Sequence, residues 1–185
     1  MAEMCLHRTR ADQVLPVYTE LLSIAATPDL MVTNRERALA AMLSLGLRWR
    51  SENIIQVVTD ILDRFGGVVP EMEAELRSLP GVGDYCANAV LAFAFGRRAV
   101  LLDTNTERIT SRVRGRSAQR RWQLRLDLYQ LAGADGPDAA FNYALLDLGA
   151  KICRHDRPRC MECPVRQHCV MGSPASVPSQ VAVVA

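Results

Sequence analysis

Lysine is almost absent from this sequence, and its absence limits the chemistry that the chain can perform. Of the 22 basic residues, 21 are arginines and only Lys151 is a lysine. Any mechanism that depends on a lysine amine therefore has one candidate.

Long apolar runs are missing as well, as is a secretion signal. The longest apolar stretch, from Ala87 to Phe95, is interrupted by Asn88 and is far too short to cross a bilayer. The N-terminus lacks the charged, apolar and small-residue pattern of a cleavable signal. We therefore expect a cytoplasmic protein whose cysteines are reduced or metal-bound rather than paired in disulfides.

The composition is that of a soluble globular protein with an uneven distribution of charge. The chain has 185 residues, of which 49% are hydrophobic and 23% charged, and this excludes collagen-like, disordered and disulfide-scaffold classes. The length suits one domain or two small lobes. The net charge is only +2, but the segment from Arg97 to Arg125 holds nine arginines against Asp103 and Glu107. This excess suits phosphate binding, although a solvated helical face has the same composition.

Hydrophobic periodicity indicates helices along most of the chain and almost no strands. Thr33 and Glu36 have the spacing of a capping box, which predicts a helix from there to Gly46. The isoleucines and valines between Asn53 and Phe65 favour strands locally, but their helical spacing indicates a helix. We predict an all-α fold with further helices over 70–79, 84–95, 103–114, 118–131 and 137–152, and a loose tail over 173–185.

Four cysteines carry the first strong chemical signal. Cys153, Cys160, Cys163 and Cys169 form the pattern C-x6-C-x2-C-x5-C within 17 residues. Four thiolates in so short a loop predict a metal site, and the spacing allows either an iron-sulfur cluster or a four-thiolate zinc ion. Four thiolates already complete a tetrahedral set, so His155 and His168 are expected on the loop surface or beside the ligands rather than on the metal. Cys5 and Cys86 lie outside the pattern and are expected to be buried as small apolar side chains.

The same loop is rich in arginine. Arg154, Arg157, Arg159 and Arg166 lie between or beside the cysteines. They could form a phosphate-binding face held in place by the metal, or simply keep the loop solvated.

The second signal is the turn Leu79-Pro80-Gly81-Val82-Gly83 between two predicted helices. Its glycines let backbone amides approach a ligand, and the helix that follows presents its N-terminal dipole to an anion. Twenty residues after Gly83, Asp103 opens a predicted helix, a position where an ordinary helix cap is common.

Together these residues resemble the helix-hairpin-helix DNA glycosylases of the endonuclease III superfamily. The resemblance extends from Glu3 to Cys169 and includes His7-Arg8-Thr9, the hairpin from Leu79 to Tyr85 and Asp103 at the head of a helix. The cysteine spacing is similar to that of the family's four-iron four-sulfur (4Fe-4S) loop. The resemblance therefore implies an iron-sulfur cofactor rather than zinc.

The resemblance also implies a role for each motif. These enzymes extrude a nucleotide from double-stranded DNA that holds a mismatched or damaged base, and they break its N-glycosidic bond. Asp103 would stabilise the cationic sugar and help to activate water. Backbone amides of the hairpin would hold a DNA phosphate, and two side chains would fill the gap left by the extruded base. The residues concerned are Gly81, Val82 and Gly83 for the phosphate, and His7 and Arg8 for the gap.

Tyr85 carries the implication for the substrate. Bifunctional relatives have a lysine at this position that forms a Schiff base with the sugar, and adenine DNA glycosylases usually have a serine. Tyrosine, together with Glu3 and Arg8, is most similar to thymine DNA mismatch glycosylases, which remove thymine or uracil opposite guanine. We therefore expect a monofunctional glycosylase, with Asp103, Glu3 and Tyr85 in its catalytic site. Tyr85 could instead be a packing residue.

Two alternatives remain open from the sequence. The first is an adenine DNA glycosylase, although such enzymes add a C-terminal recognition domain and this sequence ends soon after Cys169. The second is a DNA-binding relative that has lost catalysis, against which the presence of Asp103 argues.

The resemblance implies two lobes in a monomeric protein. Residues 1–98 would form a helical barrel lobe with the helix-hairpin-helix at 70–96, and residues 99–172 would form the iron-sulfur lobe. In this superfamily one or two helices normally precede the segment that begins at Glu3. We therefore expect coding sequence upstream of Met1 that supplies an amphipathic helix.

Overall fold

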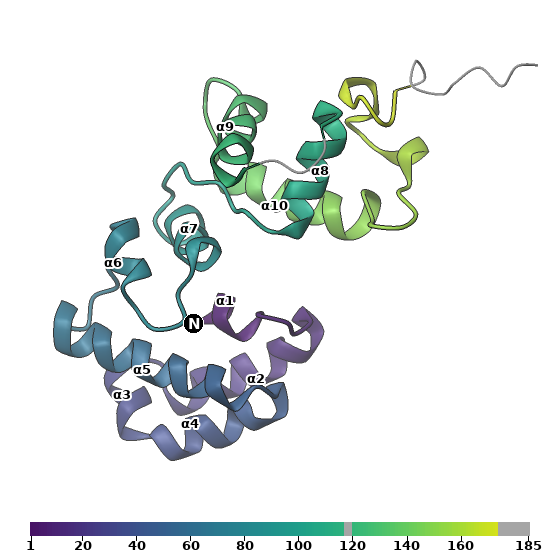
Figure 1. Cartoon of the computed structure of the whole chain (residues 1–185). Coiled ribbons are helices and arrows are strands. Elements are labelled where there is room, and N and C mark those ends of the chain that lie inside the picture. Colours follow the sequence, from purple (N-terminus) through teal and green to yellow (C-terminus); the bar gives the residue numbers. More distant parts are fainter. Residues whose placement is uncertain (117–119, 174–185) are drawn as a thin grey trace, which may run out of the picture. The chain divides into compact units, whose positions relative to one another are not determined.

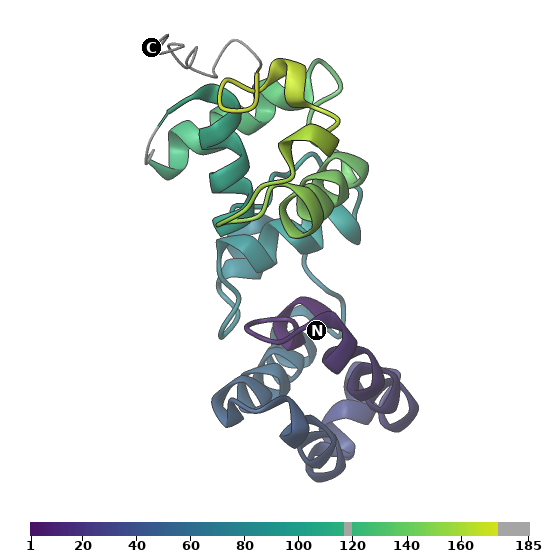
Figure 2. The ribbon, with the colours of Figure 1, turned by 90° about the vertical axis from the view of Figure 1, so that its right-hand side faces the viewer.

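A computed structural model of the chain describes residues 1–116 and 120–173, and within these ranges it is helical with no strands. The chain divides after Phe95 into two compact units, Met1–Phe95 and Gly96–Ala185. Figures 1 and 2 show the helices of each unit. The predicted all-α class is confirmed. The division lies three residues before the predicted lobe boundary, while the names given to the two lobes stay predictions.

The first unit is built around one long amphipathic helix, α5 (Arg48–Phe65). Its apolar side is buried at Ile54, Ile55, Val57 and Ile61, which is the spacing of a helix that packs on a core. Figure 1 shows α3 and α4 beside it, and α2 packs on α4 in turn. The other elements of this unit are α1 (Ala2–Cys5), α2 (Ala11–Ile24), α3 (Pro28–Thr33), α4 (Arg35–Met42), η1 (Leu43–Leu45), α6 (Glu73–Arg77) and α7 (Asp84–Phe93).

The capping box predicted at Thr33 and Glu36 is wrong. Thr33 is the last residue of α3, so its backbone is helical and cannot adopt the extended conformation of an N-cap. Asn34 occupies that position instead, and its side chain donates to the carbonyls of Ile24 and Leu30 at 3.3 and 3.0 Å. The side chain thus bonds to carbonyls in the last turns of α2 and α3 rather than to the amides at the start of α4.

The second unit begins with a buried extended segment and continues as a small helical cluster. Its core contains Val100, Leu102, Ile109, Leu124, Leu128 and Leu145. The elements are α8 (Thr104–Arg114), α9 (Arg121–Ala132), α10 (Ala139–Asp147), η2 (Leu148–Ile152), η3 (Cys160–Glu162) and η4 (Arg166–His168). Ala118, where we predicted a helix to begin, and residues 174–185 of the predicted tail lie outside the described residues.

None of the helices within 1–116 and 120–173 combines the length and the apolar character that a bilayer crossing requires.

Candidate functional site

Asp103 is the N-cap of α8, and its carboxylate is held on both oxygens. Oδ1 accepts a hydrogen bond from the Thr106 amide at 2.7 Å, and Oδ2 accepts one from Asn105 Nδ2 at 2.9 Å. The Thr106 hydroxyl accepts in turn from the Asp103 amide at 2.9 Å, which completes a capping box. The side chain is half-buried. Because each carboxylate oxygen offers more than one lone pair, the fixed carboxylate can still accept from a ligand.

The segment that leads to Asp103 is positioned by a buried asparagine. Residues 99–102 are buried but lie in no helix, so their backbone groups need partners from elsewhere. Asn142 on α10 supplies them, since its Nδ2 donates to the Ala99 carbonyl at 2.8 Å and its Oδ1 accepts from the Leu101 amide at 3.2 Å. Sequence reasoning missed Asn142. Its signal was a polar residue between the apolar side chains Phe141 and Leu145.

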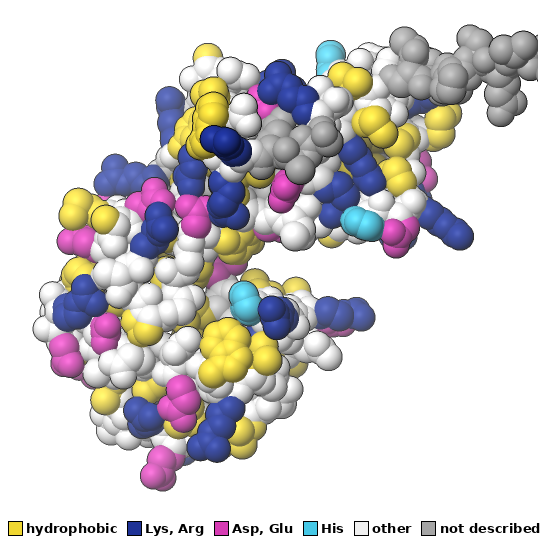
Figure 3. Space-filling model, viewed as in Figure 1, with side chains coloured by type: hydrophobic (Ala, Val, Ile, Leu, Met, Phe, Trp, Pro, Cys, Tyr) yellow, Lys and Arg dark blue, Asp and Glu magenta, His cyan; other side chains and the backbone are white. Residues whose placement is uncertain are grey.

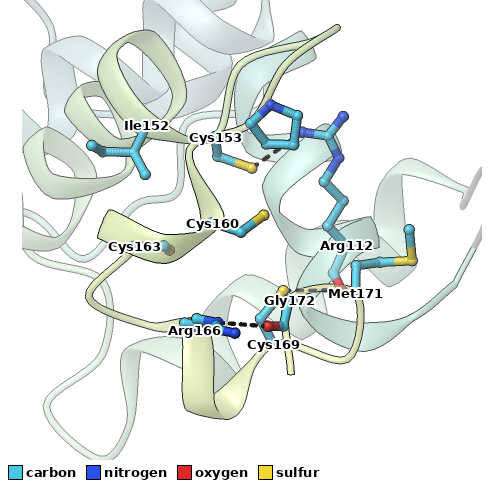
Figure 4. A pocket seen from close by; sticks show the side chains of 10 residues that line it. Arg112, Ile152, Cys153, Cys160, Cys163, Arg166, Cys169, Met171 and Gly172 are labelled. Atoms are coloured by element: carbon cyan, nitrogen blue, oxygen red, sulfur yellow. Dashed lines mark hydrogen bonds between the residues drawn. The ribbon is translucent and has the colours of Figure 1, made fainter. Parts of the chain in front are cut away.

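The four cysteines of the C-terminal loop line one cavity of ≈ 150 Å³. Figure 4 shows their side chains around a common space, with Ile152, Arg112 and Met171 on its walls. The cavity is far larger than the roughly 10–15 Å³ that admits a single water. Among the described residues, no three His, Cys, Asp or Glu side chains are grouped closely enough to ligate one metal ion. Four thiols around one cavity of this size are a donor set that an iron-sulfur cluster would fit.

The thiols also influence one another electrostatically. Burial raises the pKa of the Cys163 thiol, and the charges of Cys153, Cys169 and Cys160 raise it further, while a backbone hydrogen bond with Val165 opposes them. Thiolate groups brought this close repel each other. Binding of a cationic group would offset that repulsion, because the thiolate is the form that ligates metals.

Two arginines of α8 fix the loop to the rest of its unit. Arg112 donates to Cys153 Sγ at 3.5 Å and to the carbonyls of Arg154 and His155 at 2.6 and 2.7 Å. Arg108 donates to the Cys153 carbonyl at 2.8 Å. The first cysteine is thus held by the helix that Asp103 caps.

A wide helical turn also shapes the start of the loop. Residues Leu148–Ile152 form a π-helix, in which the Cys153 amide donates to the Leu148 carbonyl at 2.7 Å. A Cβ on Gly149 would come within 2.8 Å of the Asn105 Cβ, so this turn packs tightly on α8. Such turns are frequent at functional sites, and the sequence analysis did not predict this one.

The loop arginines differ in their partners and in their exposure. Arg159 forms an ion pair with Glu162 at 2.6 Å, and Arg166 donates to the Gly172 carbonyl at 3.0 Å. Arg154 and Arg157 are exposed. Arg159 is exposed as well, so three of the four arginines could contribute to a phosphate-binding face, one of them through a guanidinium that is already paired. On the face shown in Figure 3, basic side chains are spread across this unit rather than joined in one patch.

The predicted hairpin turn is formed and rests on α5. Gly81 has a φ of +73°, which favours glycine, and a Cβ there would lie 2.8 Å from Asn53 Nδ2. The Val82 amide donates to the Leu79 carbonyl at 3.2 Å, and Gly83 is the N-cap of α7. Tyr85 follows in the first turn of α7 and is half-buried.

Glu3 lies in α1 and is brought close to the same helix. Burial raises the pKa of its carboxyl, although the N-terminal ammonium lowers it. Glu3 is also among the groups that raise the pKa of Cys86, the residue after Tyr85, although burial of the thiol is the larger cause. The structure therefore brings Glu3 near the hairpin helix, in the unit that also holds His7 and Arg8. Asp103 and the cysteines belong to the other unit.

No protein-family model matches this chain. Proteins of known activity are nevertheless similar to it over most of its length. A thymine-DNA glycosylase of Aeropyrum pernix is 37% identical over 178 residues, which span 92% of this chain and 80% of that protein. An endonuclease III of Thermotoga maritima is 28% identical over 88% of this chain and 76% of that protein. The chain belongs to the helix-hairpin-helix DNA glycosylases.

Solved structures of such DNA glycosylases have the same fold. A thermostable thymine-DNA glycosylase matches with a TM-score of 0.83 and 25% identity, over 92% of this chain and 81% of that one. An endonuclease III in complex with DNA matches with a TM-score of 0.81 and 26% identity, over the same shares of the two chains. This chain is accordingly a DNA N-glycosylase of base excision repair.

Substitution of Gly81 should separate turn geometry from ligand contact in this glycosylase. Gly81→Ala combines a strained φ with a 2.8 Å contact, so it should lower both the melting temperature and the affinity for duplex DNA. Gly83 has a negative φ and nothing within 4 Å of an added Cβ, so Gly83→Ala should leave the melting temperature unchanged. A loss of DNA affinity in Gly83→Ala would then report close approach of DNA to the turn. If neither variant binds DNA more weakly, the hairpin is not a DNA contact.

Proposed function

We propose that this glycosylase removes thymine or uracil opposite guanine and leaves the DNA strand intact. The observation that carries the proposal is Tyr85, which stands where bifunctional relatives have their lysine nucleophile. The only lysine, Lys151, lies on η2 and forms an ion pair with Asp147 at 2.9 Å. Relatives named thymine/uracil-DNA glycosylase support the choice of base, among them one of Pyrobaculum aerophilum at 32% identity over 89% of this chain and 75% of that protein.

Asp103 is the proposed catalytic carboxylate. The N-glycosidic bond breaks with its electron pair on the departing base, and the sugar becomes cationic at C1′. The carboxylate stabilises that cation, and a water molecule adds its oxygen to C1′ while Asp103 takes up the proton released. The hydrogen bonds from Thr106 and Asn105 hold the carboxylate in one orientation during this step.

Glu3 is proposed to assist departure of the base. The raised pKa of its carboxyl favours the protonated form, which can donate to a base that leaves with an extra electron pair. Its nearness to the hairpin helix supports a shared catalytic region with Tyr85, whose half-buried ring would contact the extruded base.

The DNA contacts proposed for this chain lie in its first unit. The hairpin Gly81-Val82-Gly83 would hold a backbone phosphate through the amides of Gly81 and Gly83, because the Val82 amide already donates to the Leu79 carbonyl at 3.2 Å. His7 and Arg8 are both exposed on the short segment after α1, as expected for side chains that enter the gap left by an extruded base.

The proposed cofactor is a 4Fe-4S cluster bound by Cys153, Cys160, Cys163 and Cys169. The shared cavity and the braces from Arg108 and Arg112 support this assignment. When bound, the cluster would cross-link four points of a loop that otherwise contains only two short 3-10 turns. Its proposed role is to stabilise the folded loop.

Adenine excision is the second candidate. An adenine DNA glycosylase of Mycobacterium tuberculosis is 32% identical over 89% of this chain, but the chain spans 56% of that protein. Tyr85 in place of the serine usual in that branch favours thymine or uracil. A catalytically inactive relative is the remaining alternative, and the fully positioned Asp103 carboxylate argues against it.

Whether the DNA strand stays intact after base release tests the proposal that the enzyme is monofunctional. On a duplex with uracil opposite guanine, the enzyme should leave an abasic strand that breaks only after alkali treatment. Borohydride should trap no covalent complex, because no lysine stands at the position of Tyr85. An endonuclease III run in parallel provides the positive control for trapping. Efficient trapping of this chain would show that an amine attacks the sugar and would overturn the proposal.

A further inference from the structure

Trp49 is a large aromatic side chain on the surface of the first unit. It lies in the first turn of α5, and 51% of the residue is exposed. Its ring centroid is 5.9 Å from that of His7, with the two planes at 78°. Figure 3 shows a hydrophobic patch on this face of the first unit, with basic side chains beside it. The indole is thus braced against the segment assigned to the DNA gap and still open to a ligand.

A buried arginine ties Trp49 and His7 into one surface. Arg50 is only 2% exposed. One of its nitrogens donates to the carbonyls of Cys5, at 2.9 Å, and His7, and to the Thr9 hydroxyl at 2.9 Å. The other donates to the carbonyls of Leu45 and Gly46 at 2.8 and 3.4 Å. Within the described part of the chain, these acceptors of the Arg50 guanidinium are all uncharged.

Burial of a guanidinium without a carboxylate is costly unless all its donors are satisfied. Here they are satisfied by two segments far apart in sequence, residues 5–9 and 45–46. Arg50 therefore fixes these segments relative to each other. Sequence reasoning could have found it, because Arg50 precedes Ile54 by one helical turn and so falls on the buried side of α5.

The backbone beside both segments is strained. Arg8 and Leu47 have φ values of +58° and +56°, a left-handed conformation that residues with side chains rarely adopt. Each directly follows a residue whose carbonyl is bonded to Arg50, namely His7 and Gly46. Such strain persists where the surrounding structure enforces it, and it is common at ligand contacts.

The side chains that surround the indole are basic. Arg8 and Arg48 are both exposed, on either side of the His7–Trp49 pair in sequence. An exposed aromatic ring among arginines is the pattern by which proteins bind unpaired nucleotides, since every base has a face that can stack and every nucleotide carries a phosphate. Paired bases inside a duplex offer no such face, so the pattern indicates a base that has lost its partner.

We propose that Trp49 stacks on the base left unpaired when its partner is extruded, and that Arg50 is the positioning residue for this surface. The surface consists of His7, Arg8, Arg48 and Trp49, and its ligand is the face of an unpaired nucleobase. The inference rests on the proposed role of His7 and Arg8 in the DNA gap. It does not depend on which base the enzyme excises.

Trp49 fluorescence tests the stacking directly. The chain has two tryptophans, so Trp122→Phe, in the second unit, leaves Trp49 as the only reporter. Binding of a duplex with a stable abasic analogue opposite guanine should quench its emission, and a fully paired duplex should not. Trp49→Ala should weaken binding of the abasic duplex about ten-fold, with the paired duplex unchanged and Trp49→Phe in between. Equal quenching by both duplexes, or equal affinity in Trp49→Ala, would overturn the proposal.

Arg50→Lys tests the positioning role. Lysine keeps the charge but cannot span both segments, so the preference for the abasic duplex should fall as in Trp49→Ala. The double variant should lose no more than either single one, because both act on the same surface. If Arg50→Lys fails to fold, the Trp49 series still decides the stacking. These measurements use binding alone, so an enzyme that releases thymine without any abasic preference would refute this inference and leave the proposed function intact.

Discussion

Asp103→Asn should abolish base release while leaving DNA affinity within a few-fold of the wild-type value. The substitution removes a negative charge that matters only as the sugar becomes cationic, so the loss falls on the transition state rather than on binding. Single-turnover base release and DNA titration of the same preparation measure the two effects. Undiminished turnover in this variant would show that Asp103 is not the catalytic carboxylate.

The capping role of Asp103 supplies a matched set of controls. Asparagine and serine are good N-caps, so Asp103→Asn and Asp103→Ser should keep the bond from the Thr106 amide and the melting temperature. Asp103→Ala loses the cap and should cost about 1 kcal/mol of stability. All three should be inactive. If activity follows the melting temperature instead of the charge, Asp103 acts only as a cap.

Cys160→Ser should lose the cluster, the fold of the loop and DNA binding together. The loop has no buried residue in its two short 3-10 turns, so little apolar packing holds it without the cofactor. The wild-type protein should be brown, absorb at about 400 nm and contain about four irons per chain. Iron content, melting temperature and DNA affinity should all be lower in Cys160→Ser than in the wild-type protein.

Cys86→Ser is the matched control for this experiment. Cys86 is half-buried like Cys160, but it lies on α7 in the other unit and is not part of the cysteine loop. The variant should keep its full iron content. One zinc and no iron in the wild-type protein would contradict the proposed cluster, and iron loss in Cys86→Ser would show that the loop is not the sole iron site.

The sequence predicted those parts of the site whose signals are local. The cysteine spacing, the glycines of the hairpin and the cap before Thr104 each follow from a few neighbouring residues, and the structure forms the cavity, the turn and the capping box at those positions. The bounds predicted for the helices over 84–95 and 103–114 lie within two residues of the observed bounds of α7 and α8.

What the sequence did not predict depends on distant partners. Arg50 and Asn142 are polar residues that became buried because backbone carbonyls some 40 residues away accept their hydrogen bonds. The helix predicted at 70–79 is only Glu73–Arg77, and α5 begins at Arg48, five residues before the expected start. In the first turn of α5, Arg48 and Trp49 are exposed, and the buried residues Arg50 and Ser51 are polar, so hydrophobic spacing could not detect the turn.

The most direct measurement is the single-turnover rate of base release from three duplexes that differ only in one pair. They contain thymine opposite guanine, thymine opposite adenine, and adenine opposite oxidised guanine. We expect the fastest release from thymine opposite guanine, little release from the matched pair, and no release by Asp103→Asn. Faster release of adenine would contradict the assignment of Tyr85 and make this protein an adenine DNA glycosylase.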